Sequence, residues 1–82
     1  MWNHRVVRRV YKDVADSETV YCIHEAFYNL DGTEHKPSIT MEPDYPCGET
    51  IEELREDLQR MLRALDHPIL DYETQEELKD SR

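Results

Sequence analysis

The sequence has no long hydrophobic run and few cysteines. Its 82 residues contain nothing near the roughly 20 consecutive apolar residues of a membrane-spanning helix. The opening stretch, MWNHRVVRRV, lacks the continuous apolar segment of a secretory signal. Cys22 and Cys47 lie far apart without a C-x-x-C motif, which argues against a disulfide scaffold. These absences predict a cytoplasmic protein with reduced thiols and no membrane partner.

Basic residues are also scarce. Ten Lys and Arg stand against nineteen Asp and Glu, so the formal net charge is -9. An acidic chain repels the phosphate backbone of nucleic acids and favours basic protein partners. The length allows one domain. We place that domain at residues 1–72. Residues 73–82, ETQEELKDSR, contain one hydrophobic residue, Leu78, and we interpret them as a charged, disordered tail.

Three segments have the composition or alternation of β-strands. The first spans about residues 3–12, and the second is ETVYCIHEAFY, residues 18–28. The turn signal NLDG then predicts a hairpin to a third strand. A three-residue loop would place Phe27 opposite His35, Ile23 opposite Ile39 and Tyr21 opposite Met41. Pro37 lacks an amide hydrogen, so the third strand is expected at the sheet edge.

A helix is predicted over residues 50–66. Thr50 and Glu53 have the spacing of a capping box, and Pro68 ends the pattern. The apolar stripe comprises Ile51, Leu54, Leu58, Met61, Leu62 and Leu65. The expected fold class is therefore α+β, a three-stranded antiparallel sheet in the order 1-2-3 with this amphipathic helix packed on one face. ILDY, residues 69–72, is expected to add at most a short extended segment.

Candidate chemical groups are dispersed. The four histidines are His4, His24, His35 and His67. They lack the H-x₃-H spacing of a zinc site, so we predict neither a metal nor another cofactor. Cys47 precedes Gly48 at the helix start, where a helix dipole can stabilise a thiolate. Acidic neighbours oppose that effect, and no base for Cys47 is identifiable, so we predict no catalytic residues and no enzymatic activity. A thiol-dependent enzyme using Cys47 is the alternative.

The first strand carries cations interleaved with aromatic residues. The residues of this basic strip are Trp2, Arg5, Arg8, Arg9 and Tyr11. Single-stranded nucleic-acid binders use such mixtures, which makes nucleic-acid contact a second alternative. The other interpretation is that the arginines pair with acids on a neighbouring strand. The overall acidity favours this interpretation over nucleic acid.

A single helix can cover only one side of the expected sheet. The other side of the second strand would present a row of partly apolar residues, namely Val20, Cys22, His24, Ala26 and Tyr28. We predict that this row is a protein-interaction surface, used for homodimerisation or for a basic partner. The alternative is a mildly apolar, wet face on a monomer.

One motif resembles a known family. KPSITMEPDYP followed by CGETIEELREDLQRML resembles the small N-terminal domain of HicB-like antitoxins in its order of elements and its helix start. It is also similar to small uncharacterised bacterial proteins of the same plan. The antitoxin resemblance implies direct binding and neutralisation of a small basic ribonuclease toxin. The family's DNA-binding segment has no counterpart after Tyr72, so the prediction is a non-catalytic protein-binding module.

Overall fold

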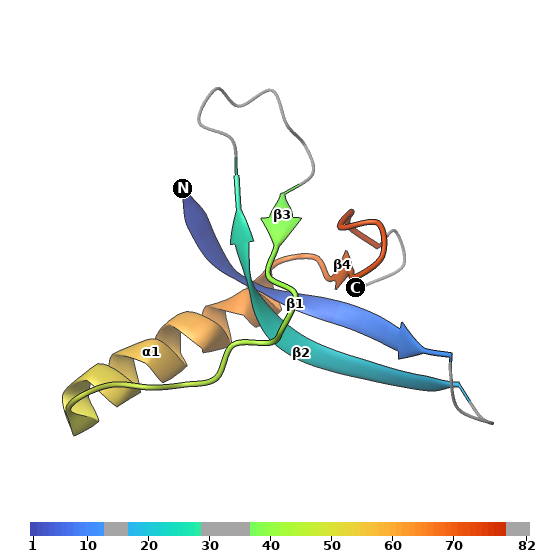
Figure 1. The fold of residues 1–82 in the computed structure, drawn as a ribbon. Coiled ribbons are helices and arrows are strands. Elements are labelled where there is room, and N and C mark those ends of the chain that lie inside the picture. Colours follow the sequence, from blue (N-terminus) through green and yellow to red (C-terminus); the bar gives the residue numbers. More distant parts are fainter. Residues whose placement is uncertain (13–16, 29–36, 79–82) are drawn as a thin grey trace.

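Two long strands form the centre of the fold. The computed structural model describes residues 1–12, 17–28 and 37–78. Strand β1, Trp2–Tyr11, pairs antiparallel with β2, Glu18–Phe27, so that Trp2 lies opposite Phe27 and Tyr11 opposite Glu18. Both strands curve strongly along their length (Figure 1). The predictions of strands at about 3–12 and within 18–28 are confirmed.

The sheet contains a fourth strand that runs parallel to its neighbour. Strand β3, Ser38–Ile39, pairs antiparallel with β2, and β4, Leu70–Asp71, pairs parallel with β1. The order is β3-β2-β1-β4. The predicted three-stranded antiparallel sheet in the order 1-2-3 is therefore wrong. Residues 51–66 are mostly helical and supply the long crossover that a parallel connection requires, which brings ILDY alongside β1.

The register of the third strand also differs from the prediction. Ala26, not Ile23, lies opposite Ile39. A shift by an odd number of residues moves Ile39 to the other face of the sheet, because side chains alternate along a strand. The predicted pairing of Phe27 with His35 is wrong as well, because Phe27 lies opposite Ser38. The predicted NLDG turn falls outside the described residues. Strand β3 does lie at a sheet edge directly after Pro37, as expected.

The helix begins where the sequence predicts. Helix α1, Ile51–Arg63, continues as a 3₁₀ turn, η1, over Ala64–Asp66. The Thr50 hydroxyl accepts a hydrogen bond from the Glu53 amide at 3.0 Å. The Glu53 carboxylate accepts from the amide of Glu49, one residue before the expected partner. These bonds satisfy amides near the helix start that have no partner within the helix.

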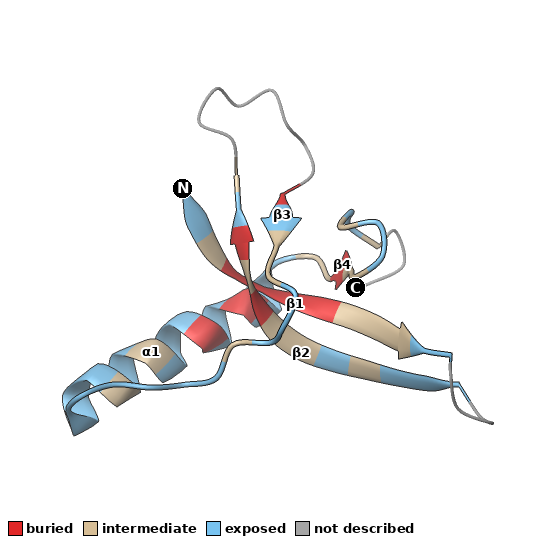
Figure 2. Cartoon of the chain, viewed as in Figure 1, coloured by how far each residue is buried: buried red, intermediate tan, exposed pale blue. Residues whose placement is uncertain are grey.

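Both faces of the sheet carry buried residues. On one side, the inner face, Val7, Ala26 and Leu70 are fully buried, and the side chains of Tyr28, Ile39 and Tyr72 pack around these three residues. On the opposite side, the helix face, the buried hydrophobic residues are Val6, Met61 and Ala64. Figure 2 shows buried segments concentrated in the middle of β1 and at the C-terminal end of α1.

The segment after β4 folds back along it. The Leu78 amide donates to the Ile69 carbonyl at 2.8 Å, and Glu77 forms a β-bridge with Leu70. Residues 73–78 of the predicted tail thus fold back against β4 and the residue before it. Residues 79–82 fall outside the described part.

The helix stripe is largely exposed, contrary to the expectation that it packs on the sheet. Ile51, Leu62 and Leu65 are each more than 60% exposed, and Leu58 is 47% exposed. The reason is the way the helix meets the sheet. Its C-terminal end lies against β1 through Met61 and Ala64, while its N-terminal end projects beyond the hairpin (Figure 1). An amphipathic pattern shows which side of a helix is apolar but not how much of that side the rest of the chain covers.

Candidate functional site

The row of residues predicted as an interaction surface lies on the inner face. His24 and Ala26 are buried, at 2% and 0% exposure. Val20, Cys22 and Tyr28 are half-buried. The prediction assumed that this face is uncovered, whereas the side chains of Leu70, Ile39 and Tyr72 pack together on it. Within the described residues, the prominent open apolar surface is on the helix face instead.

His24 is held within this inner layer. Its Nδ1 lies 3.0 Å from the Thr40 carbonyl, and its ring lies 6.0 Å from the Tyr72 ring. Burial lowers the pKa of His24 from its ordinary value of 6.5, and the nearby Arg9 charge lowers it further. The Thr40 hydrogen bond and Glu42 oppose this shift without cancelling it. A neutral imidazole is therefore part of the folded core.

Acidification is expected to destabilise the protein through His24. The folded-state pKa lies below the unfolded value, so the unfolded chain binds more protons between the two. The contribution of His24 to stability is complete above pH 6.5 and falls as the pH drops from there toward the folded pKa. The slope is at most about 1.4 kcal/mol per pH unit for one such group. Urea unfolding between about pH 7 and pH 5, with a chelator present, measures this slope.

The comparison variant is His24→Gln, which keeps a side-chain donor but does not titrate in this range. Its slope should be smaller than that of the wild type. His67→Gln, at an exposed histidine, should retain the wild-type slope. Equal slopes in all three proteins would show that His24 does not contribute to the pH dependence.

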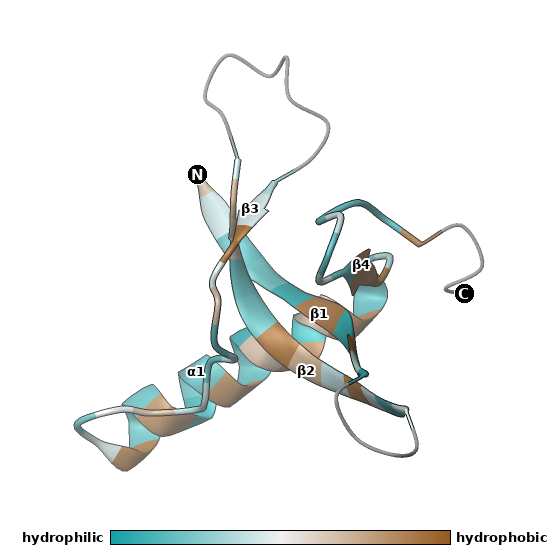
Figure 3. Ribbon diagram, turned by 45° about the vertical axis from the view of Figure 1, so that its right-hand side comes forward, coloured by the Kyte–Doolittle hydropathy of each residue, from teal (hydrophilic) through white to brown (hydrophobic). Residues whose placement is uncertain are grey.

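An apolar groove lies between α1 and β2 on the helix face. It has a volume of about 620 Å³. Its walls come from β2, the loop before the helix and the helix itself; the lining residues are Tyr21, Cys22, Ile23, Pro43, Asp44, Pro46, Leu58, Met61, Leu62 and Leu65. Figure 3 shows hydrophobic segments along α1 and in the middle of β2. The groove therefore exposes to solvent the apolar stripe that the sequence analysis assigned to the core.

A cluster of three polar residues also lies on the helix face, beside the groove. His4 on β1 is opposite Glu25 on β2, and Asp44 comes from the loop after β3. The His4 Nε2 lies 3.0 Å from Asp44 Oδ2. One ligand atom from each of these three residues lies within 4.8 Å of the others. A His, a Glu and an Asp thus converge from three separate segments.

The carboxyl groups of this cluster influence one another. Burial raises the pKa of Glu25, and the charge of Asp44 and a hydrogen bond with it raise the pKa further. His4 opposes this shift, whereas Asp57 adds to it. Sequence reasoning did not find the cluster, because residues 4, 25 and 44 share no motif. The one usable signal is the hairpin register, which pairs His4 with Glu25.

The basic strip does not form one surface. Trp2 and Arg8 point to the helix face, whereas Arg5 and Arg9 point to the inner face, because side chains alternate along β1. Arg5 is 5% exposed. The Arg9 guanidinium lies 3.9 Å from the centre of the Tyr72 ring. These arginines are therefore engaged within the chain, and the observed placement gives no support to the nucleic-acid alternative.

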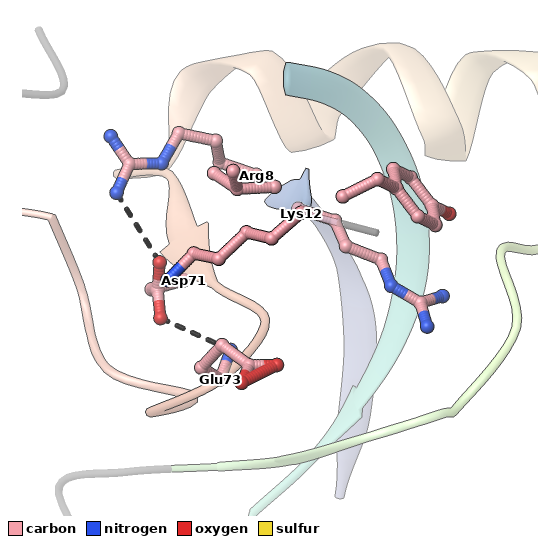
Figure 4. A pocket seen from close by; sticks show the side chains of 7 residues that line it. Arg8, Lys12, Asp71 and Glu73 are labelled. Atoms are coloured by element: carbon pink, nitrogen blue, oxygen red, sulfur yellow. Dashed lines mark hydrogen bonds and ion pairs between the residues drawn. The ribbon is translucent and has the colours of Figure 1, made fainter. Parts of the chain in front are cut away.

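Arg8 does pair with an acid on the neighbouring strand. Its Nη2 lies 3.3 Å from Asp71 Oδ1 on β4, which confirms that interpretation for Arg8. A cavity of about 600 Å³ lies beside this pair, and Arg8 and Lys12 reach toward Asp71 there (Figure 4). Burial alone would raise the pKa of Asp71, but the amides of Thr74 and Glu73 and the Arg8 guanidinium lower it overall. Two of the charged residues that line the cavity, Arg8 and Asp71, are thus paired with each other.

The two cysteines are free thiols. Cys22 is half-buried and Cys47 is exposed. The Cys47 amide donates to the Asp57 carboxylate at 3.0 Å, which ties the loop to the first half of α1. This contact uses the backbone of Cys47 and not its thiol, so it gives the residue a structural role in the loop. Among the described residues, no helix is both long enough and apolar enough to cross a membrane.

Comparisons of the chain with protein-family models, curated proteins and solved structures found no match. The resemblance to HicB-like domains therefore stays a prediction.

Proposed function

We propose that the protein is a protein-binding module whose groove between α1 and β2 receives an apolar segment of a basic partner. The observation that carries this proposal is the exposure of the helix stripe. Leu58, Leu62 and Leu65 line one wall of the groove, yet they are 47%, 65% and 62% exposed. Tyr21, on the opposite wall, is 57% exposed. Apolar surface that gathers around a concave site often marks a binding site.

The spacing of the exposed leucines along the groove favours a helical ligand. Helix α1 has 13 residues, which corresponds to a length of about 20 Å. The exposed residues Leu58 and Leu62 of α1 and Leu65 of η1 are spaced by four and three positions. This spacing lets a second amphipathic helix place its side chains between them, in the same way that helices dock into apolar grooves. Burying one such leucine fully contributes about 1.5–3 kcal/mol, so the half-exposed side chains would contribute a part of that each.

The charge of the chain favours a basic partner over a second copy. The net charge of -9 repels another copy and accelerates association with a positively charged protein. The motif resemblance to HicB-like antitoxins, which bind a basic toxin, agrees with this sign.

Site-specific photocrosslinking in the native cell tests the proposal. A photoreactive phenylalanine analogue at Leu62, inside the groove, should crosslink to a partner with a net positive charge. The same analogue at Glu56, which is exposed on another side of α1, should not. Adding Leu65→Glu should abolish the crosslink from position 62, because it introduces a charge into the apolar site. The purified partner should then bind the wild type at least about tenfold more tightly than Leu65→Glu.

Two outcomes would contradict the proposal. A crosslink between two copies of this chain would identify the groove as a dimer interface. Equal crosslinking from positions 56 and 62, unaffected by Leu65→Glu, would show that the groove is not the binding site. Circular dichroism of each variant checks that the fold is retained.

A further inference from the structure

The cluster on the helix face has the composition of a metal site. His4 offers an imidazole nitrogen, and Glu25 and Asp44 each offer carboxylate oxygens. Zn²⁺ and related divalent ions take these ligand types, often from three protein residues with solvent in the remaining position. The ligand atoms already lie within 4.8 Å of one another. Small side-chain rotations can bring them to the roughly 3.3 Å separation expected when each bond to the ion is about 2.0–2.2 Å.

We propose that His4, Glu25 and Asp44 bind one divalent transition-metal ion, with Zn²⁺ as the best-fitting ion. The argument for this site does not use the proposed partner, although Asp44 also lines the groove. Its single imidazole favours Zn²⁺ over Mg²⁺, which prefers an octahedral set of oxygens.

The surrounding contacts hold two of the ligands in place. The Asp44 amide donates to the Ile23 carbonyl of β2 at 2.8 Å, which fixes the loop against the sheet. Asp44 Oδ1 accepts from the Tyr45 amide, so Oδ2 is directed toward His4. The His4 ring is packed edge-on against the Trp2 ring, with 5.2 Å between the ring centres. Preorganisation of this kind by neighbouring groups is typical of metal ligands.

The ion would connect three neighbouring segments. His4 comes from β1, Glu25 from β2, and Asp44 from the loop that forms one wall of the groove. Binding would therefore pin that loop to the central hairpin. The alternative is that the cluster is only an ion pair between His4 and Asp44 with a neighbouring carboxyl group, and this alternative predicts no specific metal binding.

Tryptophan fluorescence provides the test. Trp2 is the only tryptophan in the chain, and it contacts His4 directly. The full-length protein is freed of metals with a chelator and then titrated with Co²⁺, which quenches nearby fluorophores. We expect saturable quenching at one ion per chain, reversed by an equimolar amount of Zn²⁺ but not by Mg²⁺. Zn²⁺ should also raise the thermal midpoint of unfolding, because it binds only the folded site.

Matched substitutions locate the site. Asp44→Asn keeps the shape of the side chain and should weaken Zn²⁺ binding by about tenfold or more, and Glu25→Gln should have a similar effect. Asp66→Asn, at an exposed aspartate, and His67→Gln, at a histidine that lines the neighbouring cavity, should leave the affinity unchanged. Circular dichroism separates loss of binding from loss of fold.

The proposal is overturned if metal-free protein shows no saturable quenching, or if both Asp44→Asn and Glu25→Gln fold normally and bind as the wild type does. It is also overturned if His67→Gln removes binding. A thiolate-to-cobalt charge-transfer band would assign the ion to a cysteine and would likewise contradict the site.

Discussion

Replacing Leu70 with alanine is expected to lower the free energy of unfolding by about 2–5 kcal/mol. Leu70 is fully buried and packs with Val7 and Ala26 at the centre of the inner face. Removing most of its side chain leaves a cavity between β4 and β1, where Leu70 lies opposite Val7. For a chain of this length the total stability is roughly 4–12 kcal/mol, so the variant should lose a large share of it. Urea unfolding followed by circular dichroism measures the change.

The matched control for this substitution is Leu65→Ala. Leu65 is 62% exposed, so its truncation should change the free energy of unfolding by less than about 1 kcal/mol. A packed helix stripe, as the sequence predicts, would make Leu65→Ala as costly as Leu70→Ala. That result would contradict the placement of β4 and the exposure of the helix.

Replacing Arg5 with methionine should also destabilise the protein, by about 2–3 kcal/mol. Arg5 is almost completely buried. Its guanidinium donates to the Tyr28 hydroxyl at 2.8 Å and to the Pro68 carbonyl at 2.7 Å. It also pairs with Glu77 at 3.3 Å. Methionine keeps much of the side-chain volume but removes these donors, so buried acceptors lose their partners.

Glu77→Gln separates the parts of this network. The Glu77 side chain is 55% exposed, so water screens its ion pair and its loss should cost less than about 1 kcal/mol. If Arg5→Met is as mild as Glu77→Gln in urea unfolding, the bonds to Tyr28 and Pro68 do not hold the connection between α1 and β4 in place. The same comparison distinguishes a buried polar anchor from a surface ion pair.

Local features of the structure are predictable from the sequence. The start of α1 follows from Thr50 and Glu53, because a capping bond involves residues only three positions apart. Strands β1 and β2 follow from their β-branched and aromatic composition. The edge position of β3 follows from the missing amide hydrogen of Pro37. In each case, a few neighbouring residues determine the outcome.

Features that depend on distant contacts were not predictable in the same way. Strand β4 has two residues, too few for a periodic pattern, and it exists because Leu70 packs on Val7. The register of β3 depends on the connection from β2, and an odd shift moved Ile39 to the inner face. The His4, Glu25 and Asp44 cluster requires the loop after β3 to return to β2. No pattern of residues in the sequence indicates that this loop comes back to β2.

The open apolar groove shows the same limit for the candidate site. Periodicity identified the apolar side of the helix correctly, since Leu58, Leu62 and Leu65 lie on one side of α1 and η1. The assignment of these side chains to the protein's own core was wrong, because they are exposed to solvent. On the inner face, which the sequence analysis left open, the Leu70 and Tyr72 side chains pack with Val7 and Ala26. The interaction surface is therefore proposed on the face that was expected to be closed.

The solvent exposure of individual methyl groups tests most directly whether the helix stripe is open and the inner face is buried. A soluble gadolinium chelate broadens the NMR signals of methyl groups that contact solvent and spares those of buried groups. The structure predicts strong broadening at Leu62 and Leu65 and protection at Leu70, Val7 and Ala26, in line with their exposure. Protection of the two helix leucines together with broadening at Ala26 would contradict the account, because it would place the helix stripe in the core and open the inner face.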